Sequence, residues 1–275
     1  MKVLSLNAHS WCESDQIAKI RDTARLIVDE GVDVVAVQEA NQLQGGIPWR
    51  SERYGGPSAL PVGADNYVQV LAEMCAHLGA EYRCYWAEAH QGFGKYDEGV
   101  GLLARADSVT ETHPLVLADY PYTDVRRRVA LAARIRGWGW VISGHFSWWE
   151  VEGQRLFEGE WGAIERFVRE HPGERVCVAG DLNNPATVVG EGYSLIRERG
   201  WWDTRDLARR AEGHDTIAGK ISGWEKARGG ARIDYVLINQ RVWVSEHRVV
   251  FTGEESPVVS DHYGVLAHVG EAEGE

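Results

Sequence analysis

The beginning of the chain alternates between two hydrophobic patterns. Residues 2–7 form an apolar run typical of a strand, and residues 15–30 repeat apolar side chains at helical spacing. Residues 32–38 then form a nearly continuous β-branched run, which predicts a strand buried on both faces. The helical stripe consists of Ile17, Ile20, Ala24 and Ile27. Strands and helices are therefore expected to alternate in the N-terminal part.

The remainder of the chain is richer in strand patterns than in helical ones. Further helices are predicted over residues 66–79, 156–171 and 193–200. Further strands are predicted over residues 82–87, 100–104, 113–117, 129–135, 138–143, 175–179, 233–239, 244–251 and 264–269. Two strand-rich halves with helices outside them favour an α/β sandwich of two β-sheets covered by helices. We expect a single domain over residues 1–270, followed by a disordered acidic tail over residues 271–275.

One long stretch, residues 41–65, fits neither hydrophobic pattern. It carries Gly45-Gly46, Pro48, Gly55-Gly56-Pro57, Pro61 and Gly63. A segment of this length is too long for a plain connection between two elements of a domain. We therefore expect it to be a lid or a binding loop.

Composition and charge narrow the classes of function. The chain has 275 residues, a net charge of −12 and only five lysines, which argues against a broad basic surface for a nucleic acid or another long polyanion. No apolar run approaches the ~20 residues of a membrane span or the length of a signal peptide. The four cysteines are scattered without a CxxC pair, as expected for reduced thiols. We therefore expect a cytoplasmic protein that does not bind membranes.

Polar residues that chemistry could use recur at the ends of the predicted strands. A single carboxylate at such a place is usually a turn former or a helix cap. Seven such places in one chain are hard to attribute to turns. They are Asn7, Gln38-Glu39, Glu98, His145, Asp181 with Asn183, Asp234, and Asp261-His262.

These segments resemble the endonuclease/exonuclease/phosphatase superfamily, whose members have the DNase I-like fold. The matching pieces cover nearly the whole chain in family order. They are Leu4-Ser5-Leu6-Asn7, Val37-Gln38-Glu39, Asp97-Glu98-Gly99, Gly144-His145-Phe146, Gly180-Asp181-Leu182-Asn183, Arg232-Ile233-Asp234-Tyr235 and Ser260-Asp261-His262. The resemblance implies a four-layered sandwich of two packed mixed sheets flanked by helices. It also implies one metal-dependent phosphoesterase site at the strand ends.

The resemblance further implies a divalent metal ion, Mg²⁺ or a similar ion such as Mn²⁺. A hard cation held by carboxylate and amide oxygens stabilises the charge that develops during attack of water on a phosphate ester. Glu39 matches the main metal ligand of the family, with Asn7 and Asp261 nearby. Asp181 and Asn183 match the pair that positions the attacking water and a phosphate oxygen, with Asp181 as the general base. Either one or two metal ions are compatible with this pattern.

Two histidines are implied to face the phosphate. His262 with Asp234 matches a His–Asp pair in which the carboxylate orients the imidazole and favours its charged form. His145 matches a second histidine, and Glu98 is its expected carboxylate partner.

Three consecutive arginines, Arg126, Arg127 and Arg128, enter a predicted strand. Because alternate strand residues face opposite sides, Arg126 and Arg128 should share a face and Arg127 should not. The arginines could form a solvated rim or a phosphate clamp beside the metal, since guanidinium binds phosphate oxygens in bidentate fashion. The sequence leaves the choice of arginine open.

Aromatic residues directly follow several of these motif residues. Flat apolar faces at a site mouth can stack on a sugar ring or on a base, so we expect side chains of this group to contact substrate. The expected substrate contacts are His9, Trp11, Trp148, Trp149 and Trp224, together with Lys220 from the glycine-rich loop before Asp234. The segment Asn7-Ala8-His9-Ser10-Trp11 most specifically resembles the maltose 6′-phosphate phosphatase branch of the superfamily.

These observations lead to one main hypothesis with two alternatives. The main hypothesis is a Mg²⁺-dependent phosphomonoesterase acting on a small phosphorylated substrate, most of all a sugar phosphate. The first alternative is a metal-dependent endonuclease or exonuclease acting on phosphodiesters, which the acidic composition disfavours. The second is a binding module that has lost its chemistry, which the presence of every motif acid and histidine disfavours.

Overall fold

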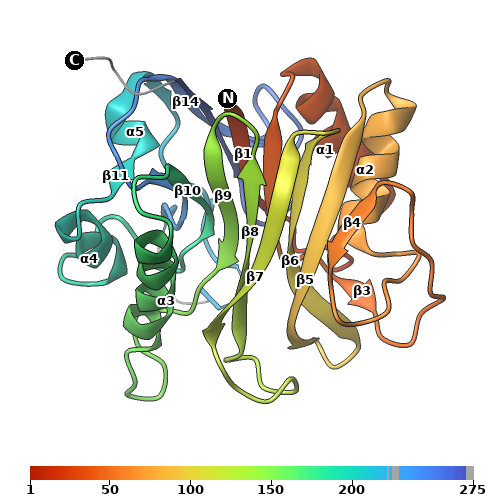
Figure 1. Ribbon diagram of the computed structural model, residues 1–275, viewed down its shortest axis with the longest axis horizontal. Coiled ribbons are helices and arrows are strands. Elements are labelled where there is room, and N and C mark those ends of the chain that lie inside the picture. Colours follow the sequence, from red (N-terminus) through yellow and green to blue (C-terminus); the bar gives the residue numbers. More distant parts are fainter. Residues whose placement is uncertain (222, 225–228, 271–275) are drawn as a thin grey trace.

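Two β-sheets pack face to face, with helices on both outer sides (Figure 1). The protein is described by a computed structural model that covers residues 1–221, 223–224 and 229–270. The predicted acidic tail at residues 271–275 lies outside the described residues.

The first sheet is mixed, because β1 and β2 run parallel whereas β1 and β15 run antiparallel. Parallel pairing aligns Asn7 with Gln38, so that both strands end at the same edge. In spatial order the described strands are β12 (Ala208–Glu212), β14 (Val244–Val250), β15 (Gly264–Val269), β1 (Lys2–Asn7), β2 (Val34–Gln38), β6 (Tyr96–Arg105), β5 (Tyr82–Gly92) and β4 (Tyr54–Pro57), and β3 (Gln42–Leu43) pairs with β6.

The second sheet is also mixed. Strands β9 and β10 run parallel and align His145 with Asp181, and β13 runs antiparallel to β10 and aligns Asp234 with Asp181. In spatial order the described strands are β11 (Trp202–Asp203), β13 (Asp234–Ile238), β10 (Val176–Asp181), β9 (Gly139–His145), β8 (Arg128–Ile135) and β7 (Val109–Ala118).

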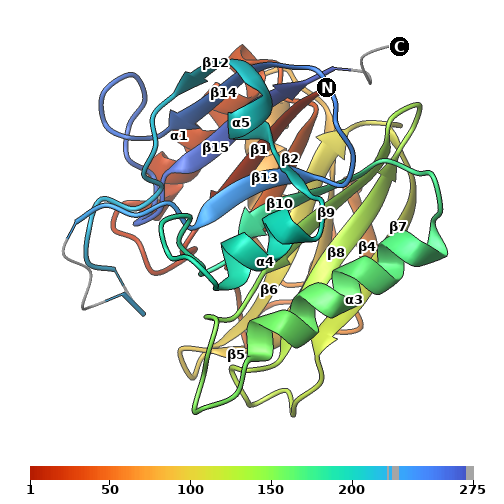
Figure 2. The ribbon, with the colours of Figure 1, turned by 90° about the vertical axis from the view of Figure 1, so that its left-hand side faces the viewer.

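The helices form the two outer layers. Helices α1 (Gln16–Asp29) and α2 (Tyr67–His77) pack on the outer face of the first sheet. Helices α3 (Leu156–Glu170) and α4 (Gly192–Glu198) cover the second sheet (Figure 2), and the short α5 (Thr204–Leu207) contacts β13 and β14. The order helix, sheet, sheet, helix confirms the predicted four-layered α/β sandwich.

The strand β2 shows why the sequence folds into these layers. Val35 and Val37 point into the apolar cluster under α1 and α2, whereas Val34 and Ala36 point into the cluster between the two sheets. A strand at this position must be apolar on both faces, and the β-branched run at residues 32–38 meets that requirement. The prediction of a strand buried on both faces is confirmed.

Hydrogen bonds anchor the two ends of the long segment 41–65. It contains the two short strands β3 and β4. The Trp11 indole nitrogen donates to the carbonyls of Asn41 and Asp65, at 3.2 and 2.9 Å, and the Asp65 carboxylate accepts from the backbone N–H of Leu43 at 2.8 Å. These bonds hold both ends of the segment together, and none of its residues is among the described residues that line the two clefts discussed below. The expectation of a lid or a binding loop stays a prediction.

The structure also bears on the expectations about membrane spans and cysteines. No helix within the described ranges is long and apolar enough to cross a membrane. All four cysteines are free thiols, as the sequence predicts.

Candidate active site

The strand ends of the two sheets meet at one edge of the sandwich, where hydrogen bonds join the two sheets. The Asn7 amide nitrogen, at the end of β1, donates to the Asp181 carboxylate at the end of β10, over 3.1 Å. It also donates to Glu39, which follows β2, over 2.9 Å. Parallel pairing within each sheet therefore brings motifs far apart in the sequence to one place.

Several residues at this edge adopt backbone conformations that side chains disfavour. Glu39, Asn183 and His9 have positive φ angles of 47°, 50° and 40°. Such conformations cost of the order of 1–3 kcal/mol each and persist where surrounding structure enforces them, often at functional sites. Their concentration next to the strand ends marks this edge as a candidate functional site.

Glu39, Asn7 and Asp261 could hold a divalent metal ion. Glu39 and Asp261 line the same cleft, and one Glu39 carboxylate oxygen accepts from Asn7. The second Glu39 oxygen accepts no hydrogen bond from any described residue. Oxygen donors in acidic surroundings suit a hard dication such as Mg²⁺ or Mn²⁺, so the donor set fits the expected metal.

Asp181 lies at the centre of the site. One carboxylate oxygen accepts from the backbone N–H of Asn183 at 2.8 Å, and the other lies 3.7 Å from His145 and 3.8 Å from His262. Burial and the neighbouring Asp234 raise the pKa of Asp181, against the opposing effect of His262. Asp181 is thus a buried carboxylate whose affinity for a proton is unusually high, which suits a general base.

His262 and Asp234 form the expected pair. Nδ1 of His262 lies 2.9 Å from the Asp234 carboxylate, and both side chains are buried. Burial alone would lower the pKa of His262, but Asp234 and Asp181 outweigh it and raise this pKa to about 10. The imidazole is therefore charged at neutral pH, and its Nε2 is directed toward Asp181.

His145 differs in charge from His262. Burial and the Arg128 guanidinium hold the pKa of His145 well below its ordinary value, so this ring is neutral. The Asn183 amide is oriented by Trp224, which donates to its oxygen at 2.9 Å, and by the carbonyl of Phe146, which accepts from its nitrogen at 3.0 Å. That nitrogen also lies 3.2 Å from Nε2 of His145. Nδ1 of the same ring lies 3.4 Å from the Arg128 guanidinium, so both nitrogens of this neutral ring face a donor.

Glu98 occupies the expected place near His145 but has a second neighbour that the sequence did not reveal. Its carboxylate lies 3.9 Å from Nδ1 of His145 and 3.4 Å from Nε2 of His90. Burial and the Glu39 carboxylate raise the pKa of Glu98. His90 lies inside β5, not at a strand end, so the pattern of strand-end motifs carried no signal for it.

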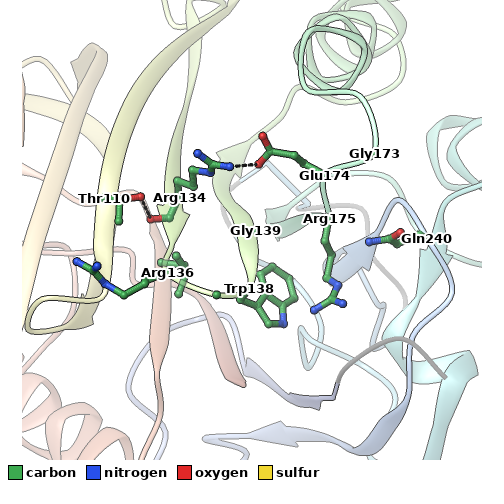
Figure 3. Close-up of a pocket in the computed structure, with 11 residues that line it drawn as sticks. Thr110, Arg134, Arg136, Trp138, Gly139, Gly173, Glu174, Arg175 and Gln240 are labelled. Atoms are coloured by element: carbon green, nitrogen blue, oxygen red, sulfur yellow. Dashed lines mark hydrogen bonds and ion pairs between the residues drawn. The ribbon is translucent and has the colours of Figure 1, made fainter. Parts of the chain in front are cut away.

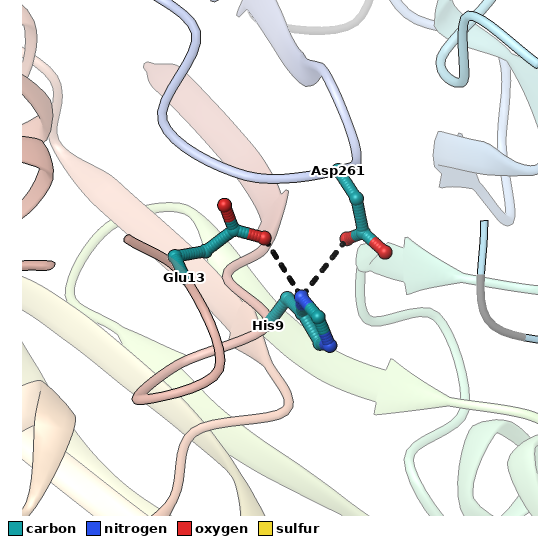
Figure 4. Close-up of side chains that lie close together, drawn as sticks. All are labelled: His9, Glu13 and Asp261. Carbon is teal, nitrogen blue, oxygen red and sulfur yellow. Dashed lines mark hydrogen bonds and ion pairs between the residues drawn. The ribbon is translucent and has the colours of Figure 1, made fainter. Parts of the chain in front are cut away.

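His9 lies at the rim of the cleft between two carboxylates (Figure 4). Its Nδ1 is 2.7 Å from Glu13 and 3.7 Å from Asp261. Burial lowers the pKa of His9, but Asp261 and Glu13 outweigh this effect and raise it. Glu13 also pairs with Lys19, at 2.5 Å, so this cluster already contains a balancing cation. Glu13 was not among the predicted residues, because it follows no strand.

The three arginines behave differently from the alternation that the sequence predicted. Strand β8 begins only at Arg128, and Arg126 and Arg127 lie in the preceding turn. Arg126 pairs with Asp124 at 2.7 Å, and Arg127 donates to the backbone carbonyl of Glu88 at 3.1 Å. Arg128 alone of the three lines the cleft, and its Nε is buried without a partner in the described part of the chain.

The predicted aromatic wall is also only partly assembled. Trp148 lines the cleft. Trp11 packs against the core under α1 and α2, and Trp149 packs near Phe157 beneath Arg155, so neither lines the cleft. Trp224 donates a hydrogen bond to Asn183 and is not among the described residues that line the cleft. Lys220 is not among the described residues of the cleft lining.

The cleft that these residues enclose has a volume of ≈ 300 Å³. A larger groove of ≈ 490 Å³ lies at the opposite end of the sandwich, beside the turn between β8 and β9 (Figure 3). There Arg134 pairs with Glu174 at 3.1 Å, and Arg175 stacks over Trp138, 5.1 Å from the ring centroid. None of the described residues of that groove belongs to the predicted site. We therefore take the smaller cleft as the candidate active site.

Comparison with known proteins agrees with this geometry. No curated protein matches the sequence. Among solved structures, an endonuclease/exonuclease/phosphatase family protein from Leptotrichia buccalis is 26% identical with a TM-score of 0.83, over 98% of this chain and 99% of that chain. A mannosyl-6-phosphatase from Bacteroides thetaiotaomicron is 14% identical with a TM-score of 0.68, over 98% and 99% of the two chains. Truncated TDP2 from Caenorhabditis elegans is 14% identical with a TM-score of 0.61, over 98% and 96%.

At these lower identities, the last two structures show a shared fold. The sequence itself is matched from residue 12 to residue 262 by the model of the endonuclease/exonuclease/phosphatase family. This match covers most of the chain and includes the motifs that meet at the cleft, apart from Asn7. The chain belongs to the endonuclease/exonuclease/phosphatase family.

Proposed function

We propose that this protein is a divalent-cation-dependent phosphomonoesterase that hydrolyses a small phosphorylated substrate, with a sugar phosphate as the preferred class. The observation that carries the proposal is the pairing of opposite charges at the cleft floor. The guanidinium of Arg128, whose Nε has no partner among the described residues, and the charged imidazole of His262 lie in the same cleft as the carboxylate of Asp181. These groups match the needs of a phosphoryl group and of the water that attacks it.

The acidity of the floor supports the requirement for a cation. Glu39, Asp181 and Asp261 line the cleft against the positive charges of Arg128 and His262, and Glu98, whose pKa is raised by burial and by Glu39, adds a fourth acidic group. An anionic phosphate would be repelled by this excess of carboxylates in surroundings of low dielectric constant. A divalent ion bound by Glu39, Asn7 and Asp261 would offset the repulsion and polarise a phosphoryl oxygen.

The side chains of this chain have separable roles in the proposed reaction. Asp181 accepts a proton from the water whose oxygen bonds to phosphorus, and its raised pKa suits that step. His262, held by Asp234, donates to a phosphoryl oxygen, and Arg128 binds further phosphoryl oxygens. The bond from phosphorus to the leaving oxygen breaks, and that oxygen takes up a proton from water.

His145 contributes by orientation. The neutral ring of His145 contacts the Asn183 amide through Nε2 and keeps this amide in place beside Asp181. Trp224 supports the same amide from the other side, so it acts as a positioning residue rather than as a contact for the substrate.

Two observations favour a small monoester over a nucleic acid. The cleft of ≈ 300 Å³ is at the small end of ligand pockets, and Arg126 and Arg127 are engaged by groups of the protein itself. A sugar is favoured by the resemblance of Asn7-Ala8-His9-Ser10-Trp11 to the maltose 6′-phosphate phosphatase branch. The structural similarity to a protein named mannosyl-6-phosphatase agrees with this choice.

The test is release of inorganic phosphate from a panel of monoesters. The panel contains hexose 6-phosphates, maltose 6′-phosphate, nucleoside monophosphates, inositol phosphates and p-nitrophenyl phosphate, each with Mg²⁺ or Mn²⁺. Bis-p-nitrophenyl phosphate and single-stranded DNA represent diesters, and the Asp181→Asn protein is the control for contaminating activity. We expect release from sugar phosphates that stops with EDTA and returns with Mg²⁺. A preference for diesters, or full activity in EDTA, contradicts the proposal.

A further inference from the structure

We propose that Phe93, at the tip of the hairpin between β5 and β6, is a specificity-determining residue that packs against the ring of a sugar phosphate. This inference rests on the proposed function and adds to it the residue that recognises the leaving group. Phe93 lines the cleft, and it was not among the predicted site residues.

The backbone at Phe93 is the first argument. Phe93 and Gly94 have φ angles of 50° and 67°, and the N–H of Lys95 donates to the carbonyl of Gly92 at 3.1 Å. Two central residues with positive φ are typical of a type I′ turn, where Asn, Asp and Gly are favoured because they tolerate this conformation. A bulky residue with positive φ is an outlier, so the chain has a costly residue at this point.

Packing within the protein does not explain why a phenylalanine stands there. The side chain is 54% exposed, and its ring contacts with His9 and Tyr96 are edge contacts at centroid distances of 6.0 and 6.5 Å. An exposed aromatic ring gains little from burial, and a strained backbone position is more often explained by function than by stability. The apolar contact that would bury the Phe93 ring is therefore one that a bound ligand would supply.

The hairpin is built to bring this ring over the catalytic floor. Gly92, the residue before Phe93, packs so closely on Glu98 that an added Cβ would lie 2.6 Å from the Glu98 carboxylate. Only glycine allows the strand to approach Glu98 in this way. Figure 1 shows this hairpin beside the loop that joins β7 to β8, and Val125 from that loop is also exposed, at 58%, and also lines the cleft.

The cleft thus has a charged floor and an apolar mouth formed by Phe93, Val125 and Trp148. The phosphoryl group belongs on the floor, so the mouth receives the group attached to the ester oxygen. The C–H face of a pyranose ring suits an aromatic side chain, whereas its hydroxyl groups need polar partners at the edge. His9 lies next to Phe93, and its Nδ1 is held by Glu13, so the remaining ring nitrogen can bond a hydroxyl group.

The experiment compares two substrates that share a phosphate and differ in the ring, mannose 6-phosphate and glycerol 3-phosphate. Phe93→Asn removes the aromatic ring and installs a residue that the turn favours. Loss of one stacking contact should raise KM for mannose 6-phosphate about tenfold, with KM for glycerol 3-phosphate changed less than about twofold. The melting temperature should stay the same or rise, because the turn is relieved of strain.

Two control variants make the outcome decisive. Phe93→Tyr, which keeps the ring, should retain the preference for mannose 6-phosphate. Val189→Asn replaces an apolar side chain that is 92% exposed and lies outside the cleft, and it should change neither KM. Equal effects of Phe93→Asn on the two substrates, a fall in its melting temperature of several degrees, or a preference of the wild-type protein for nucleoside monophosphates overturns the inference. If the wild-type protein releases phosphate from no monoester, the proposed function fails first, independently of any Phe93 variant.

Discussion

Arg128 offers the sharpest test of the catalytic floor, because the sequence itself supplies a matched control. Arg126, Arg127 and Arg128 are consecutive and chemically identical, yet only Arg128 lines the cleft. We expect Arg128→Gln to lower kcat/KM strongly and Arg126→Gln to leave it within about twofold of the wild-type value, since Arg126 is engaged by Asp124.

The magnitude follows from the bonds that the guanidinium can form. A hydrogen bond to a charged group contributes about 1.5–3 kcal/mol, and about 1.4 kcal/mol corresponds to a factor of ten. Two bonds to phosphoryl oxygens, which are not fully additive, predict a loss of about 10²- to 10³-fold in kcat/KM. Arg128→Lys should recover part of this loss, because it keeps the charge but lacks the planar fork.

The melting temperature of the Arg128→Gln protein separates a role in binding phosphate from a role in holding the fold together. Arg128 is only 7% exposed, but no carboxylate among the described residues lies within ion-pair distance of its guanidinium. Its replacement therefore breaks no ion pair, and the melting temperature should change by less than about 4 °C, or ~1 kcal/mol. The assay is phosphate release at saturating Mg²⁺, with melting followed by circular dichroism. Equal losses in the Arg126 and Arg128 variants, or near-normal kcat/KM in folded Arg128→Gln protein, would refute the assignment.

Three further substitutions probe the base, the metal and the charged histidine. Asp181→Asn should lower kcat by about 10²–10⁴-fold through loss of a positioned base, and near-normal turnover by the folded variant would show that another group accepts the proton. Glu39→Gln should raise the Mg²⁺ concentration needed for half-maximal activity, because an amide binds a hard dication less well; an unchanged midpoint in a metal titration contradicts a ligand role. Asp234→Asn should lower the pKa of His262, which Asp234 and Asp181 raise against burial, so the alkaline limb of the kcat/KM profile should move to lower pH. An alkaline limb that stays in place means that another group controls it.

The predicted site residues that the structure brings together lie at strand ends. Apolar runs locate the strands, and parallel pairing forces strands such as β1 and β2 to end at the same edge. A polar residue just after such a run is therefore placed by topology, without any knowledge of the intervening loops. Asn7, Asp181 and His145 are brought together for this reason.

The parts that were not predicted depend on where an element begins and on how loops pack. Alternation of Arg126 and Arg128 assumed a strand that in fact starts at Arg128. Trp11 directly follows motif residues, but a turn directs its indole to the carbonyls of Asn41 and Asp65. His90 reaches the cleft from within β5, a position that no local pattern distinguishes from a core residue.

This division between strands and loops also bears on how the site could acquire its selectivity. The groups proposed to act on the phosphate are placed by the sheets: Asp181 ends β10, and His262 lies two residues before β15. The groups at the mouth, Phe93 and Val125, belong to connections that contribute little to the core. A substitution at the mouth can therefore change the leaving group that is accepted while the floor keeps its geometry, because the two sets share few contacts. Contacts of the mouth with the sugar ring of the substrate should therefore change the relative kcat/KM of different esters. Contacts of the floor with the phosphate should change kcat/KM equally for all of them.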